Sequence, residues 1–356
     1  MRANKYGVGM VLLCGSVGLA LSACGGAGAD GVLGGRPAVC DQVAAADGPG
    51  AGTAGSHGQP QRSDGSVSIS RHDGKVVASR QVDVVNDFGG ASAAQVDLAS
   101  VNGDVIACTR DGGGYRARVF LEARAATEAE ARSALDTMVV THTDTLTAGT
   151  LRLNTRVDFD SSSSGSGLPV CVLCDDEGDS DVTAQRSATI LEGLPASASY
   201  SLSPSTTNGD AAAFGLSGSA AQLTTSNGNV ALNGRWDSAT LSATNGIVGV
   251  SGDYASLNAS AGNGQVEALL QTARSLDATL SATNGYVEAK LARSNAGFDV
   301  QGQSANGEVR IDIAGTEAVG TQTRESAHRR SPDYASRAVQ VQLTGSATNG
   351  SVDIHQ

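Results

Sequence analysis

The chain has 356 residues, of which 17% are charged and only 3% aromatic, and its formal net charge is −12 at pH 7. An acidic chain without a long run of Lys or Arg repels a phosphate backbone, so this composition excludes nucleic acid as a partner. The 46 glycines are typical of a chain with many tight turns.

Residues 1–23 have the pattern of a bacterial lipoprotein signal peptide. Arg2 and Lys5 precede an apolar stretch, residues 8–21, that is too short to span a bilayer. The following Leu-Ser-Ala-Cys resembles a lipobox, in which Cys24 becomes the first residue and carries acyl chains. We therefore predict lipidation at Cys24, attachment to a membrane through that lipid, and a location in the cell envelope, at the outer membrane or the cell surface. An ordinary secretory peptide is the alternative.

Residues 24–61 are mostly glycine, alanine and short polar residues. Such a segment buries too little apolar surface to offset the entropy lost on ordering, so it is predicted to be a flexible tether.

Four cysteines remain beyond the lipobox, namely Cys40, Cys108, Cys171 and Cys174. In an exported protein an even number predicts up to two disulfides, and we favour a bridge within the Cys171–Cys174 pair or from this pair to Cys40 or Cys108. A redox or metal pair is the alternative. Because there is no second C-x-x-C and the five histidines are scattered, no metal or cofactor is expected.

Residues 62–160 contain short runs that alternate between apolar and polar residues, which predicts a β-rich N-terminal region. One segment, 127–138, breaks the alternation. Thr127 is followed three residues later by Glu130, the signature of a helix N-cap, so one helix is predicted here.

Residues 161–184 are predicted to be a linker that begins with serine and glycine and contains the C-x-x-C pair. Its acidic residues at 175–181 do not match the spacing of an EF-hand, so a solvated loop is favoured, and calcium binding there stays open.

Residues 185–356 repeat a short pattern about every 18–22 residues, and "ATLSATNG" occurs twice, at 239–246 and 278–285. Each unit carries an Asn-Gly pair with apolar residues at alternate positions on both sides, such as Leu241 and Val248. We predict a strand, a tight corner with positive φ at the Asn-Gly pair, and a second strand. The predicted corners begin at Asn208, Asn227, Asn245, Asn263, Asn284, Asn306 and Asn349.

The regular period favours stacked coils over a meander of hairpins. The fold class predicted is all-β, with a β-helix-like solenoid of Asn-Gly coils after a β-rich N-terminal part that contains one helix. An earlier pair, Asn102-Gly103, uses the same corner chemistry. Residues 317–337 interrupt the period and contain the most concentrated basic patch, so they are predicted to be a loop inserted before the final coil, with binding as one role for it.

The "VDVVNDFGG" at 82–90, the alternating strands with one helix, and the run of units that ends in "TNGSVDI" at 348–354 carry a family resemblance. Over residues 62–356 the chain resembles the bacterial putative-adhesin family of β-strand-repeat proteins, a domain of unknown function. This resemblance implies a β-solenoid, an extracytoplasmic location and no known catalytic residues.

The function predicted is an adhesin-like binding or interaction scaffold whose ligand is an unknown protein or glycan. An envelope structural or sensor protein that binds another envelope component is the alternative. A polysaccharide-acting enzyme is less favoured, because it needs two carboxylates facing one cleft. Glu267, Glu288 and Glu308 recur at nearby positions but stand among polar residues, and we expect them to form a solvated face.

Overall fold

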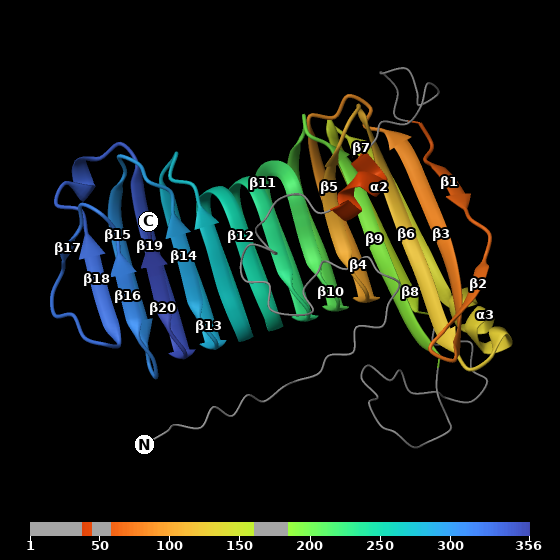
Figure 1. Ribbon diagram of the computed structural model, residues 1–356. Helices are drawn as coiled ribbons and strands as arrows, with labels where there is room; N and C mark the ends of the chain where they lie inside the picture. The colour runs from red at the N-terminus through yellow and green to blue at the C-terminus, as the bar shows by residue number, and fades with distance from the viewer. Residues whose placement is uncertain (1–37, 45–57, 160–183) are drawn as a thin grey trace, which may run out of the picture.

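The computed structural model describes residues 38–44, 58–159 and 184–356, which form an elongated molecule of strands stacked along one axis (Figure 1). Hydrogen bonds join all twenty strands of these residues. The prediction of an all-β chain is confirmed.

Residues 38–44 and 58–159 contain two short helical turns, one longer helix and eight strands. Their bounds are η1 (Ala38–Cys40), α2 (Asp41–Ala44), β1 (Gln61–Asp64), β2 (Ser68–His72), β3 (Lys75–Asp87), β4 (Ala93–Asn102), β5 (Val105–Arg110), β6 (Gly114–Ala125), α3 (Glu128–Asp136), β7 (Met138–Thr147) and β8 (Thr150–Phe159).

The second half contains the repeats. Its elements are β9 (Gln185–Pro195), β10 (Ser199–Asn208), β11 (Ala211–Asn227), β12 (Val230–Leu270), β13 (Leu276–Asn284), β14 (Val287–Leu291), β15 (Gly297–Ser304), β16 (Val309–Asp312), β17 (Glu317–Ala318), β18 (Ser326–Arg330), η2 (Tyr334–Ser336), β19 (Gln340–Asn349) and β20 (Val352–His355).

Each coil bends at its Asn-Gly pair, so that its two halves lie in two different parallel layers. The first sheet contains β8, β4, β10, the second half of β11, segments of β12, β13, β19 and β15. The second sheet contains β9, β5, the first half of β11, other segments of β12, β14, β20 and β16. The core lies between them.

The core is built from small aliphatic side chains that alternate with outward polar ones. In one coil Leu241 and Ala243 precede the corner, Val248 and Val250 follow it, and all four are at most 2% exposed. Because a β-strand turns successive side chains to opposite faces, this alternation buries one face of each sheet and leaves the other to solvent.

Antiparallel strands extend both sheets at the N-terminal end. β3 and β6 continue the second sheet from β9, and β7 continues the first from β8. The predicted helix is confirmed as α3, with the Thr127 side chain and the Glu130 side chain closing a reciprocal capping box. Its Ala131 and Leu135 are buried.

The coil of residues 340–355 lies out of sequence order. β19 pairs with β13 on one side and with β15 on the other, and β20 pairs with β14 and β16. The expectation that this coil follows all the others is therefore wrong. It sits between the coil of 276–291 and the coil of 297–312, and the antiparallel β18 covers the outer edge of β15 instead (Figure 1).

Residues 38–44, within the segment predicted to be a tether, are packed instead of free. Val39 and Val43 are buried in a small apolar cluster on the outer side of the second sheet, and a disulfide joins Cys40 to Cys108 of β5. The apolar side chains and this bond hold the segment against β5, β9 and β11.

At every corner except that of Gly307 the glycine has positive φ, for example Gly246 at 150°, whereas none of the corner asparagines does. Positive φ at a non-glycine residue occurs among the described residues only at Asp73 and Ala148. The expectation of positive φ at the corner asparagines is therefore wrong. A Cβ at Gly246 would also overlap the carbonyl oxygen of Gly228 in the preceding coil. Glycine at position 246 is required by both the backbone angle and the close approach of the preceding coil.

Three substitutions at one corner should differ in a graded way. Gly246→Ala should lower the free energy of unfolding by roughly 2–4 kcal/mol, because it introduces strain and overlap. Asn245→Ala should cost about 1–2 kcal/mol through lost side-chain hydrogen bonds. Thr244→Ala, on the exposed neighbour, should stay within about 0.5 kcal/mol and serves as the control. Chemical denaturation measures all three, and equal stability of the Gly246 and Thr244 variants would contradict this account of the corner.

Candidate interaction surface

The corner asparagines form one continuous ladder along the molecule. Each side-chain Nδ2 donates to the Oδ1 of the preceding coil, over 2.7–2.9 Å. In spatial order the ladder runs through Asn102, Asn208, Asn227, Asn245, Asn263, Asn284, Asn349 and Asn306. The ladder therefore keeps every coil in the same register.

This register aligns the outward side chains of the first sheet into columns, and we call the outward side of β10, β11, β12, β13 and β19 the hydroxyl face. Its side chains are exposed or half-buried, and most are serine or threonine. The hydroxyl-bearing residues are Ser199, Ser201, Ser203, Ser205, Thr207, Thr224, Ser226, Ser238, Thr240, Ser242, Thr244, Ser256, Ser260, Thr279, Ser281, Thr283, Thr344, Ser346 and Thr348.

One column of the hydroxyl face is uninterrupted from β10 to β19. It contains Ser205, Thr224, Ser242, Ser260, Ser281 and Ser346. Strands lie about 4.8 Å apart, and outward residues of one strand follow each other at about 6.5–7 Å, so the hydroxyls approximate a regular two-dimensional lattice. Hydroxyl groups both donate and accept hydrogen bonds, which suits a ligand that carries many such groups.

The hydroxyl face is almost uncharged. Asp277 is its one ionisable side chain, and its remaining outward residues are Ala220, Gln222, Asn258, Gly262, Gln340 and Gln342. Beyond its ends the same sheet carries charges, with Arg152 and Arg156 on β8 and Asp299 on β15. A surface of this kind offers neutral hydrogen bonding, with neither a basic patch for phosphates nor an apolar patch.

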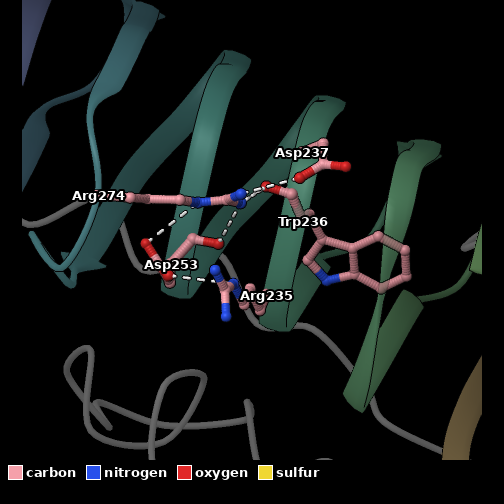
Figure 2. A network of polar contacts seen from close by, with 5 residues as sticks. All are labelled: Arg235, Trp236, Asp237, Asp253 and Arg274. Carbon is pink, nitrogen blue, oxygen red and sulfur yellow. Dashed lines mark hydrogen bonds and ion pairs between the residues drawn. The ribbon is translucent and has the colours of Figure 1, made fainter. Parts of the chain in front are cut away.

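The second corner of the coils is fixed by a different contact, shown in Figure 2. Arg274 lies between β12 and β13 and donates to Asp237 at 2.8 Å and to the backbone carbonyl oxygens of Trp236 and Asp253. Its Nε also lies 3.4 Å from the Asp253 carboxylate, which Arg235 approaches from the other side. The guanidinium thus ties three successive coils together, while the indole of Trp236 points away into the core.

A short acidic column follows the Asn-Gly corner at the N-terminal end of the stack. The Asp104 carboxylate accepts from the backbone N–H of Asp210, the Asp210 carboxylate from Asn229, and the Asn229 side-chain oxygen from Ile247. Burial, and next the neighbouring Asp104, raise the pKa of Asp210 to about 6, and burial raises the pKa of Asp104.

A chain of polar side chains runs through the core of the N-terminal part. The Tyr115 hydroxyl contacts Asp144 at 2.5 Å and His142 Nε2 at 3.0 Å, His142 Nδ1 contacts Thr155, and Thr155 donates to Glu192. Burial lowers the pKa of His142 to about 4 and raises that of Glu192 to about 8, so both groups are held neutral at pH 7. Glu192 and Thr155 have no exposed surface, which fits a link between sheets better than a reaction site.

Residues 317–337, which interrupt the repeat, fold into β17, β18 and η2 and cover the outer edge of β15. Within this segment, His328 contacts Asp299 at 2.6 Å, Arg329 donates to the backbone carbonyl of Thr316, and the Arg330 guanidinium lies 4.8 Å from the centre of the Tyr334 ring. A hollow beside Arg330 is lined by Glu317, Ala318, Val319, Ser331, Pro332, Tyr334 and Ala335. The basic residues are thus tied to their neighbours rather than gathered as a free cationic surface.

The disulfide between Cys40 and Cys108 excludes a bridge from either residue to Cys171 or Cys174. The predicted lipidation site Cys24, the C-x-x-C pair and the acidic residues 175–181 lie outside the described residues.

The three glutamates do not form a solvated face. Glu267 is only 1% exposed and accepts a hydrogen bond from the Tyr286 hydroxyl at 2.8 Å, so the expectation for this residue is wrong. Glu288 pairs in register with it and is half-buried, whereas Glu308 is exposed and lies outside this column. The column continues through Asp353 to a basic residue, Arg310.

No group of His, Cys, Asp and Glu within the described ranges is arranged to hold a metal ion. Among the same residues, no helix is long and apolar enough to cross a membrane.

The sequence matches a known protein family over its repeat region. The Toastrack DUF4097 model matches residues 176–354, half of the chain. The chain belongs to the Toastrack DUF4097 family. In this DUF4097 protein the stack of coils begins before the matched segment. β4 and β5 pair in parallel with β10 and β11, and Asn102 at the end of β4 is the first asparagine of the ladder.

Two solved structures are similar to this DUF4097 protein. One is a putative cell adhesion protein from Clostridium sporogenes, with a TM-score of 0.36, 10% identity, and coverage of 78% of this chain and 99% of the other. The second is a putative adhesin from Bacteroides fragilis, with a TM-score of 0.32, 11% identity, and coverage of 77% and 96%. No curated protein matches this chain.

The pH dependence of stability should change when Asp210 is replaced by Asn. The folded-state pKa of Asp210 is raised to about 6 from 3.8, so the ionised carboxylate lowers the free energy of unfolding at pH 7. This destabilisation should disappear as the pH falls from about 7 to 4 and the carboxyl group becomes protonated in the folded protein. Asp210→Asn should therefore add about 1–3 kcal/mol to the free energy of unfolding at pH 7 and little at pH 4.

Asn229 occupies the equivalent place in the next coil and accepts the same type of hydrogen bond, so the amide fits this column. Asp277→Asn, at an exposed carboxylate, is the control for charge removal in general. Urea titrations at both pH values would contradict the account if the two Asn variants behaved alike.

Proposed function

We propose that this protein is an extracytoplasmic, lipid-anchored, adhesin-like scaffold that binds its ligand on the hydroxyl face and has no catalytic activity. The stacked coils act as a β-solenoid rod, and acyl chains on Cys24 attach it to the membrane. The single observation that supports a binding role is the regular, almost uncharged, hydroxyl-bearing lattice on the outward side of the first sheet. The names of the two solved proteins state a role of this kind for them.

The chemistry of the hydroxyl face favours a neutral glycan over a protein surface. Stable protein interfaces depend on buried aromatic, Met and Arg anchors, and these residue types do not occur among the outward residues of the hydroxyl face. A ligand that carries hydroxyl groups at a regular spacing can exchange many hydrogen bonds with a lattice of serines and threonines. Such binding gains its strength from many weak contacts.

Charged, bulky side chains placed in the hydroxyl face should abolish this binding. In a Thr240→Arg, Thr279→Arg variant, the two long side chains stand in the same column on opposite sides of Asn258 and would lift a flat ligand from the lattice. Ser217→Arg with Gln271→Arg, at exposed positions away from the hydroxyl face, is the matched control. Retention of the full chain on immobilised neutral polysaccharides, from dextran and mannan to envelope glycans of bacteria, measures the effect.

We expect retention of the wild type and the control on at least one of these polymers, with little effect of salt, and loss for the variant on the hydroxyl face. The proposal would be overturned if both variants were retained equally, or if none of the three proteins bound to any of the polymers.

Protease shaving of intact cells tests the location. If the rod is anchored on the outside by lipid, added protease should remove the full-length protein from intact cells, and a Cys24→Ser variant should leave the membrane fraction for the soluble one. Protection in intact cells, with digestion only after lysis, would contradict surface exposure and support an envelope partner instead.

A further inference from the structure

The corner dipeptide Asn-Gly has a chemistry of its own. The backbone nitrogen of the glycine can attack the side-chain carbonyl carbon of the asparagine, which forms a five-membered succinimide and releases ammonia. Water then opens the ring at either carbonyl and gives aspartate or isoaspartate. Glycine favours this reaction because it has no side chain to hinder the approach of its nitrogen. In a folded protein the rate depends on whether these two groups are held elsewhere.

Inside the ladder both groups are held. Asn227 donates through Nδ2 to Asn208 and accepts from Asn245, and the backbone N–H of Gly228 donates to the backbone carbonyl of Asn245 at 3.0 Å. The backbone N–H groups of Gly103, Gly209 and Gly285 are engaged in the same way. For the reaction to start, the side chain must leave the ladder and the glycine must lose its acceptor.

The last rung differs from the inner ones. Asn306 donates through Nδ2 to Asn349 at 2.9 Å, but no further coil follows it, and its Oδ1 accepts no hydrogen bond from any described residue. The N–H of Gly307 likewise donates to no described residue, and the Asn306 side chain is exposed. This position follows from the fold, because β18 lies antiparallel against β15 where the next parallel coil would otherwise stack.

Asn349 is intermediate between these cases. Its side chain is held at both ends, by Asn284 and by Asn306, but the N–H of Gly350 donates to no described residue. A further Asn-Gly pair, Asn233-Gly234, lies at the second corner, where the Asn233 Nδ2 is fixed by Ser251 at 2.6 Å.

We propose that Asn306 is a site of spontaneous deamidation in the folded protein, whereas the inner rungs of the ladder are protected by their hydrogen bonds. The reaction consumes one water, releases one ammonia and leaves aspartate or isoaspartate at this position. The new carboxylate cannot donate to the Oδ1 of Asn349, so the last hydrogen bond of the ladder is lost. The exposed end of the stack gains one negative charge.

Mass spectrometry of the ageing protein tests this directly. The full chain is incubated at mildly alkaline pH, and fragment spectra assign the mass increase at each Asn-Gly pair over time. Two fixed hydrogen bonds should slow the attack roughly tenfold or more, so we expect Asn306 to react at least about ten times faster than Asn227, with Asn349 between them. An isoaspartate-specific methyltransferase should label the same site.

Two controls distinguish protection by the ladder from the intrinsic reactivity of the Asn-Gly dipeptide. In denaturant, where the ladder is absent, all Asn-Gly pairs should react at similar rates. In the folded Asn349→Ala variant, Asn306 loses its one ladder bond, so its rate should rise while that of Asn227 stays unchanged. Equal rates at Asn306 and Asn227 in the folded wild type, or a faster reaction at Asn227, would overturn the proposal.

Discussion

The hydrogen bond between stacked corner asparagines is the constraint on which the rest of this molecule depends. Because each side-chain amide inside the ladder bonds to the coils on both sides, a coil can join the stack only with its corner in line with its neighbours. A slip of one residue would break this bond and would also turn every inward side chain, such as Leu241 and Val248, toward solvent. The glycine after each asparagine makes the ladder attainable, since its missing Cβ, together with positive φ at every corner but that of Gly307, lets successive corners approach closely.

A fixed register on the inside also fixes the outside. Once the aliphatic residues at alternate positions are buried, the residues between them must line up as columns on the outer side of the same sheet. In this chain those positions are mostly serine and threonine, so the surface with the most regular chemistry results directly from the packing of the core. Binding at the hydroxyl face and stability of the stack are therefore two results of one sequence pattern.

The period of the Asn-Gly pairs predicts the corners and the inward residues, because these depend only on local spacing. The order of the coils does not follow from it. The ladder bond is the same for every coil, so nothing in the pattern distinguishes a place at the end of the stack from the inner place that residues 340–355 occupy. The burial of Glu267 depends on its contact with Tyr286 in the next coil, and the role of Arg274 depends on contacts with the preceding coils. Neither contact is visible in the spacing of the Asn-Gly pairs. The sequence shows serines and threonines between the inward positions, but only the register of the coils shows that they form columns on one face.

The two ends of the stack bear on how this architecture could bind a ligand, either on the hydroxyl face or by addition of a strand to an end. A parallel stack ends in unpaired backbone groups that would recruit another chain. Here the stack changes from parallel to antiparallel at both ends, through β6 and β7 on one side and β18 on the other. An antiparallel strand such as β18 carries no Asn-Gly corner at the right place, so the asparagine ladder ends at Asn306. The regular surface that the ladder builds is therefore the side of the stack, where the hydroxyl face lies.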